Sequence, residues 1–97
     1  MRVWVGAGWQ ARSQIEAVLG SAQADSLGGS TGNDSLSGAA GDDSLSGGAG
    51  ADTLVGGTGD DTIGGGIGHD VITGNSGDDR LSGDIGKDSI QGGSGED

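Results

Sequence analysis

An aspartate recurs every nine residues along most of this 97-residue chain, and this period constrains the possible folds more than any other feature. The series runs without a slip through Asp25, Asp34, Asp43, Asp52, Asp61, Asp70, Asp79, Asp88 and Asp97. A branched aliphatic residue follows two positions after each of the first eight, and glycines precede each aspartate from Asp34 onward by two and by five positions. Disordered low-complexity sequence has nothing to fix its spacing, so three residue classes in phase indicate a structural repeat.

Each nine-residue unit divides into a loop and a very short strand. The six residues that end on the aspartate are rich in Gly and Asp, which predicts a turn, and we number these loop positions one to six. The next three residues read polar–aliphatic–polar, as in 44–46, which predicts a strand whose middle side chain points inward. Two nine-residue units then make one 18-residue coil, with one strand in each of two facing parallel sheets. One sheet would carry Leu27, Leu45, Ile63 and Leu81, and the other Leu36, Leu54, Ile72 and Ile90.

The composition excludes several classes of function. The formal net charge of −11 argues against a basic surface for nucleic acids or anionic membranes, and no apolar run is long enough to span a membrane. The absence of Cys excludes disulfides and thiolate chemistry. With 25 glycines and only 30% hydrophobic residues, a core built on one aliphatic side chain per unit is thin. Composition alone leaves a disordered segment or a fold that needs an ion.

The spacing of the aspartates favours calcium. Stacked coils place Asp34 beside Asp52 and Asp43 beside Asp61, at a strand separation of about 4.8 Å, where carboxylates repel each other unless cations lie between them. Calcium takes about 6–8 oxygen ligands at about 2.3–2.6 Å, so oxygens on opposite sides of one ion are about 5 Å apart. Magnesium is smaller and requires a strict octahedron, while zinc, iron and copper sites favour Cys or clustered His. Six loop pairs predict about six calcium ions, whose total charge of about +12 nearly balances −11.

The unit resembles the repeats-in-toxin (RTX) nonapeptide G-G-x-G-x-D-x-U-x, as in GGAGADTLV (47–55) and GGTGDDTIG (56–64). The resemblance covers 29–97 and implies a parallel β-roll, a right-handed solenoid with an 18-residue coil and two facing short-stranded sheets. It also implies that calcium is held by aspartate side chains and loop carbonyls from two loops one coil apart. The implied side-chain ligands are Asp34, Asp43, Asp52, Asp61, Asp70, Asp79, Asp88 and Asp97. The implied carbonyl ligands include Gly47, Gly48, Gly50, Gly56, Gly57, Gly59, Gly65, Gly66 and Gly68.

Several positions depart from the family pattern. Ser30, Ala39, Asn75 and Asp84 replace the glycine at loop position two. Asn and Asp tolerate positive φ, so we expect the last two loops to keep their shape and sites that use Ser30 or Ala39 to be weak. Asp42, Asp60 and Asp78 at position five, and the single His69, are expected to be exposed loop residues rather than calcium ligands.

Two segments are predicted. Residues 25–97 form the repeat array, which ends within a repeat, so we expect a truncated C-terminal end and further repeats or a C-terminal cap in a longer protein. Residues 1–24 are interpreted as degenerate initial turns or an N-terminal cap, in which Trp9 and Val18 continue the aliphatic column. The alternative for 1–24 is a short unrelated tail.

The predicted function is calcium binding that couples extracellular calcium to the folding of a secreted module. The resemblance implies a bacterial protein exported by a one-step (type I) secretion system. No catalytic motif is present, so we expect no enzymatic activity, and any activity would lie in a separate domain of a larger protein. The alternatives are a structural or adhesive spacer of a surface protein, or an ice-binding roll, although the outward rows such as Ser35, Thr53, Val71 and Ser89 are irregular.

Overall fold

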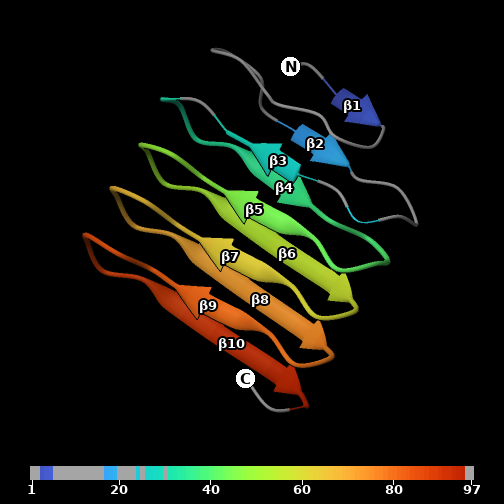
Figure 1. Ribbon diagram of the computed structural model, residues 1–97. Helices are drawn as coiled ribbons and strands as arrows, with labels where there is room; N and C mark the ends of the chain where they lie inside the picture. The colour runs from blue at the N-terminus through green and yellow to red at the C-terminus, as the bar shows by residue number, and fades with distance from the viewer. Residues whose placement is uncertain (1–2, 6–16, 20–23, 25, 30, 96–97) are drawn as a thin grey trace.

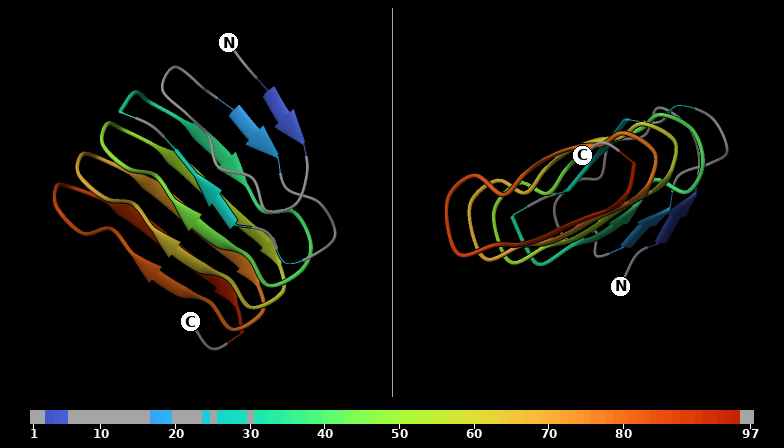
Figure 2. Two further views of the ribbon diagram at one scale, coloured as in Figure 1. Left: turned by 45° about the horizontal axis from the view of Figure 1, so that its top comes forward. Right: turned by 90° about the horizontal axis from the view of Figure 1, so that it is seen from below.

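The computed structural model describes residues 3–5, 17–19, 24, 26–29 and 31–95, and these form a parallel β-solenoid without helices (Figure 1). A six-stranded sheet has the order β1-β2-β4-β6-β8-β10 and a four-stranded sheet the order β3-β5-β7-β9. The strands of the first sheet are β1 (Val3–Val5), β2 (Ala17–Leu19), β4 (Ser35–Ser37), β6 (Thr53–Thr58), β8 (Val71–Ser76) and β10 (Ser89–Ser94). The second has β3 (Ser26–Gly28), β5 (Ser44–Ser46), β7 (Thr62–Gly64) and β9 (Arg80–Ser82). Figure 2 shows the coils one behind another as flattened rings.

The register of the strands confirms the predicted 18-residue coil. Leu36 pairs with Leu54 and Leu54 with Ile72 in the six-stranded sheet, while Leu45 pairs with Ile63 in the four-stranded sheet. The same interval separates the partners in every one of these pairs, so each aliphatic side chain stacks on its counterpart in the next coil. The predicted division of the aliphatic residues between the two sheets is therefore confirmed.

The core contains one aliphatic side chain from each of the strands β3 to β9, in two columns that face each other between the sheets. Six of its residues are at most 2% exposed: Leu27, Leu36, Leu45, Leu54, Ile63 and Ile72. Leu81 packs against this cluster and is partly buried, while Ile90 in the last strand is 45% exposed because no described coil covers it. Burial of an aliphatic side chain contributes about 2 kcal/mol, so one such side chain per strand gives little apolar stabilisation to a chain with this much glycine.

The sequence prediction of three-residue strands is wrong for three strands of the six-stranded sheet. The strands β6, β8 and β10 contain six residues, because backbone pairing continues through the first three loop positions, as in Gly57 with Asn75 and Thr58 with Ser76. The amide N–H of Thr58 also donates to the carbonyl of Ala39 in the preceding coil, at 2.9 Å. Coils that repeat without insertion keep the loop backbones parallel, so the hydrogen-bond ladder does not stop where the aspartate-rich sequence begins.

The loops lie along two edges of the solenoid. We call the edge that holds loops 38–43, 56–61 and 74–79 the acidic edge, because Asp42, Asp60 and Asp78 occupy its fifth positions. We call the edge that holds loops 29–34, 47–52, 65–70 and 83–88 the mixed edge. Loops of the acidic edge lead from the six-stranded to the four-stranded sheet, and loops of the mixed edge lead back.

The N-terminal strands join the six-stranded sheet. Val18 pairs with Leu36 in the register of the later coils, but Trp4 pairs with Val18 over a shorter interval of sequence, so the first coil is shorter than the others. Trp9, expected to continue the aliphatic column, lies outside the described residues. The interpretation of 1–24 as initial turns or a cap stays a prediction.

The second loop position requires positive φ even where it is not glycine. Ala39 has a φ of 70°, Asn75 of 75° and Asp84 of 66°, while the glycines at this position, such as Gly48 at 92°, share the conformation. Asn and Asp adopt this region more readily than Ala, so the expectation that Ala39 fits its loop less well has a physical basis in the backbone. Ser30 lies outside the described residues.

Replacing Ala39 by glycine is expected to stabilise the folded chain by about 1 kcal/mol, because it relieves a left-handed conformation that alanine disfavours. Urea unfolding in saturating calcium measures the effect. The matched control is Ala40→Gly, at a neighbouring residue without positive φ, where glycine should destabilise. Equal shifts for the two variants would contradict the expectation.

Candidate metal centre

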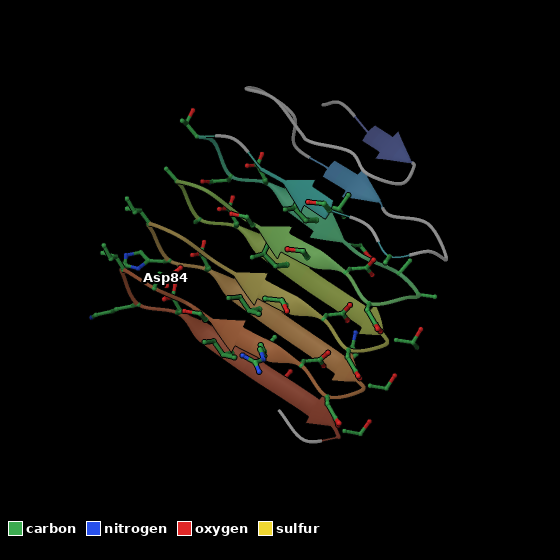
Figure 3. All side chains as sticks on the ribbon, viewed as in Figure 1. Asp84 is labelled. Atoms are coloured by element: carbon green, nitrogen blue, oxygen red, sulfur yellow. The ribbon has the colours of Figure 1, made fainter. Side chains whose placement is uncertain are left out.

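The sixth-position aspartates are the most buried charged residues of the loops. Asp34, Asp43, Asp52, Asp61, Asp70 and Asp79 are between 1% and 4% exposed. Asp88, in loop 83–88, is partly buried, and Asp97 lies outside the described residues. Figure 3 shows oxygen-bearing side chains recurring from coil to coil beside both loop edges, with Asp84 labelled on the mixed edge. Carboxylates are buried in proteins when they are paired or coordinate a metal ion, so their environment indicates their role.

Each buried aspartate uses most of its polar atoms to join coils. The N–H of Asp52 donates to Oδ1 of Asp70 at 2.9 Å, and Oδ1 of Asp52 accepts from the N–H of Asp34 at 2.7 Å. The carbonyl of Asp52 accepts from the N–H of Val71 at 2.8 Å. The same contacts recur around Asp61 in the neighbouring column, where its N–H donates to Oδ1 of Asp79 at 2.8 Å. Around Asp52 and Asp61, these contacts leave the second carboxylate oxygen, Oδ2, outside the coil-to-coil network.

That second oxygen is buried without a hydrogen-bond donor. In the described part of the chain, Oδ2 of Asp52, Asp61 and Asp70 is inaccessible to solvent and has no hydrogen-bond partner. A buried anionic oxygen left unpaired costs several kcal/mol unless a cation compensates it. The unpaired oxygen is the atom that a calcium ion would use, so the aspartates fit the predicted metal.

Burial raises the pKa of two of these aspartates. For Asp52, burial outweighs the stabilising N–H of Asp34, and the carboxylates of Asp34 and Asp70 add repulsion, so its pKa rises from 3.8 to about 6. Burial likewise raises the pKa of Asp61 to about 6, with the Asp43 and Asp79 carboxylates contributing after the opposing N–H of Asp43. The loops therefore hold charge in an environment that disfavours it without a compensating cation.

The glycines at the first loop position bring carbonyl oxygens close to Oδ2 of the buried aspartates. A Cβ atom on Gly47 would lie 2.6 Å from Oδ2 of Asp52 and 2.6 Å from the carbonyl oxygen of Gly65 in the next coil. A Cβ on Gly38 would similarly meet Oδ2 of Asp43 and, at 2.7 Å, the carbonyl oxygen of Gly56. Carboxylate and carbonyl oxygens from two coils thus converge beside a glycine, and hard oxygens of this kind are the ligands that calcium prefers.

The other predicted carbonyls have different surroundings. At position two, the carbonyl of Gly48 accepts from the N–H of Ile67 at 2.9 Å, and that of Gly66 accepts from Ile85 at 3.0 Å. Gly57 lies in β6 opposite Asn75. At position four, the carbonyls of Gly50 and Gly59 abut the glycines of the same position one coil later, namely Gly68 and Gly77. The first-position carbonyls of Gly56 and Gly65 are therefore the ones that the structure brings to a buried Oδ2, of Asp43 and Asp52, and the carbonyl of Gly47 lies beside Oδ2 of Asp34 in the same way.

Side chains alone do not form a metal site in the described residues. No group of three or more His, Asp or Glu side chains lies close enough together to hold an ion. Any ion between the loops needs backbone carbonyls in addition to the aspartates, as the family resemblance implies.

The fifth loop position was not recognised as structural from the sequence. Asp42, Asp60, Asp78 and His69 are exposed, as expected. However, Oδ1 of Asp42 accepts from the N–H of Asp60 at 2.8 Å, and Nδ1 of His69 accepts from the N–H of Lys87 at 3.0 Å. The signal that could have revealed this role is the frequency of hydrogen-bond acceptors at that position.

Stacked loops of glycine and aspartate on a parallel β-solenoid define a class of cation-binding repeat proteins. The family model of the RTX calcium-binding nonapeptide repeat, which comprises four copies, matches residues 28–63 and 64–97. The chain therefore belongs to the RTX calcium-binding repeat family, which confirms the resemblance found in the sequence and identifies its repeats as calcium-binding. Comparison with curated proteins and with solved structures gives no match. The described residues include no helix that is long and apolar enough to cross a membrane.

Proposed function

We propose that this chain is a calcium-dependent folding module in which ions lie between loops one coil apart. The proposed side-chain ligands are Asp34, Asp43, Asp52, Asp61, Asp70, Asp79, Asp88 and Asp97, together with first-position carbonyls such as those of Gly47, Gly56 and Gly65. The observation that carries the proposal is the buried, unpaired Oδ2 of Asp52, Asp61 and Asp70. These oxygens are costly in the ion-free fold, so ion binding supplies free energy for folding.

The same physics suggests where the module works. In a cytosol poor in calcium, the buried carboxylates oppose folding, while in a medium with about 10⁻³ M calcium the ions stabilise the stack. Proteins with RTX repeats are typically secreted by bacteria, which agrees with this interpretation. We propose an extracellular module of a secreted protein, exported in an unfolded state.

Calorimetric titration of the chain with calcium tests the binding. We expect about six ions per chain, with affinities of about 10⁻⁴–10⁻³ M that are typical of extracellular calcium modules. Magnesium serves as the control, because its smaller octahedral shell fits the coil spacing poorly. Absence of heat and of bound calcium after equilibrium dialysis would refute the proposal.

The ion-free chain is also expected to gain β-structure as the pH falls from about 6 to about 4. The folded pKa of about 6 for Asp52 and Asp61 exceeds the ordinary value of 3.8, so the ion-free folded chain holds more protons than the unfolded chain between these values. Its free energy of unfolding therefore falls as pH rises from about 4 to about 6. Protonation of Asp52 and Asp61 thus relieves part of the buried charge that calcium compensates at neutral pH. Circular dichroism of the chain in chelator at about pH 4.5 and at about pH 8 measures the effect, and equal β-structure at the two pH values would contradict the expectation.

A further inference from the structure

The fifth loop position forms a second ladder of hydrogen bonds, outside the buried aspartates. On the acidic edge, Oδ1 of Asp42 accepts from the N–H of Asp60, and Oδ1 of Asp60 accepts from the N–H of Asp78, both at 2.8 Å. Each bond joins the same position in two loops that are 18 residues apart. The fifth-position side chains are exposed, yet each of these bonds fixes one loop against the next.

The mixed edge has the same ladder with different chemistry. Oδ1 of Asn33 accepts from the N–H of Ala51 at 2.9 Å, and Nδ1 of His69 accepts from the N–H of Lys87 at 3.0 Å. A carboxylate, an amide and an imidazole thus make the same contact. These three kinds of side chain share a hydrogen-bond acceptor but differ in charge.

The hydrogen bonds of the fifth and sixth loop positions run in opposite directions between the same two loops. Between loops 38–43 and 56–61, the N–H of Asp43 in the earlier coil donates to Oδ1 of Asp61 in the later coil at 2.8 Å. In the same pair, the N–H of Asp60 in the later coil donates to Oδ1 of Asp42 in the earlier coil. Neighbouring residues therefore cross-link the two loops in both directions, next to the oxygens proposed to hold an ion.

The backbone at position four makes room for this contact. A Cβ on Gly59 would lie 3.0 Å from Oδ1 of Asp42, and Gly59 has a φ of 110°. Gly77 has the same relation to Oδ1 of Asp60, at 3.1 Å. The fourth-position glycine lets the acceptor of the preceding coil approach the turn, so the glycine and the acceptor function together.

We propose that the fifth-position acceptor is a positioning residue for the calcium sites, because it sets the separation of the two loops between which an ion is held. This inference rests on the proposed calcium ligation by the sixth-position aspartates. The fifth-position ladder is interrupted at Ala51, which has no side-chain acceptor, so loops 47–52 and 65–70 lack this hydrogen bond. The position acts through its hydrogen bond, and the charge of Asp42 or Asp60 is dispensable for that role.

Two double variants distinguish the effect of the fifth-position hydrogen bond from the effect of the charge. D42A/D60A removes two acceptors and two charges, while D42N/D60N removes the charges but keeps an amide oxygen, as in Asn33. The alanine variant loses one net hydrogen bond per loop pair. We therefore expect its calcium midpoint to be roughly fivefold higher than that of the asparagine variant. In saturating calcium, amide exchange at residues 60 and 78 should be faster in the alanine variant only. Equal midpoints and equal exchange rates would overturn the proposal.

A gain-of-function variant tests the interruption. A51N supplies an acceptor for the N–H of His69, and the exposed side chain at residue 51 leaves space for it. We expect slower amide exchange at residue 69 in saturating calcium and a lower calcium midpoint, with A51S, a shorter side chain, as the comparison. Unchanged exchange at residue 69 would overturn the proposal. A wild-type chain that takes up no calcium would instead refute the proposed function, so the two failures are distinguishable.

Discussion

Replacing Asp61 by asparagine is expected to affect the ion-free and the calcium-bound chain in opposite directions. Asparagine keeps an oxygen that accepts from the N–H of Asp43. It removes, however, a buried carboxylate, and burial raises the pKa of this carboxyl group to about 6. In calcium-free buffer at pH 7 the variant should therefore have more residual β-structure than the wild type. In calcium it loses a charged ligand, so the calcium midpoint should rise roughly tenfold to a hundredfold.

Circular dichroism during calcium titration measures both effects. The control is Asp84→Asn, which removes one exposed charge at a second loop position where Asn75 already has nearly the same φ. We expect this control to shift the midpoint little, because exposed charges are screened by salt. A midpoint for the Asp61 variant close to that of the Asp84 variant would show that the buried carboxylate does not hold the ion.

Alanine in place of Gly47 should eliminate one calcium site and destabilise the chain by about 2 kcal/mol or more. The added Cβ would fall 2.6 Å from both Oδ2 of Asp52 and the carbonyl oxygen of Gly65, so it occupies the space on which these oxygens converge. Gly47 lacks the positive φ of its neighbour Gly48, so the effect is steric rather than conformational. Calorimetric stoichiometry should fall by about one ion, and the urea midpoint in calcium should decrease.

Gly64→Ala is the matched control for this steric effect. A Cβ at Gly64 would meet only Oδ2 of Asp84, at an ordinary contact distance of 3.7 Å. We therefore expect wild-type stoichiometry and a small change in stability for this variant. If both glycine variants kept the wild-type number of ions, the convergence at Gly47 would not be a calcium site.

The fold was predictable from the sequence because each of its determinants repeats. The 18-residue coil, the pairing of Leu36 with Leu54 and the separation of the aliphatic residues into two sheets follow from a period that is never interrupted. The extension of β6 into its loop was not predictable from composition. Glycine-rich segments resemble turns when they are considered locally, and only the stacking of parallel coils reveals that their backbones remain paired.

The site was predictable in part for a related reason. The period identified the sixth-position aspartates, since a regular row of carboxylates needs a cation. The period did not show that Oδ1 of Asp52 accepts a hydrogen bond while Oδ2 is left unpaired. The different roles of the two oxygens depend on how neighbouring coils are positioned relative to each other. The role of Asp42 was missed for the same reason: exposure and function as an acceptor for the next coil are compatible, and sequence position alone reports only the exposure.

Far-ultraviolet circular dichroism of the wild-type chain during parallel calcium and magnesium titrations tests most directly whether calcium drives folding. We predict a cooperative change from coil to β-structure at about 10⁻⁴–10⁻³ M calcium, and no such change with magnesium. A chain that has its full β-structure in chelator, or that stays unfolded up to about 10 mM calcium, would contradict calcium-driven folding.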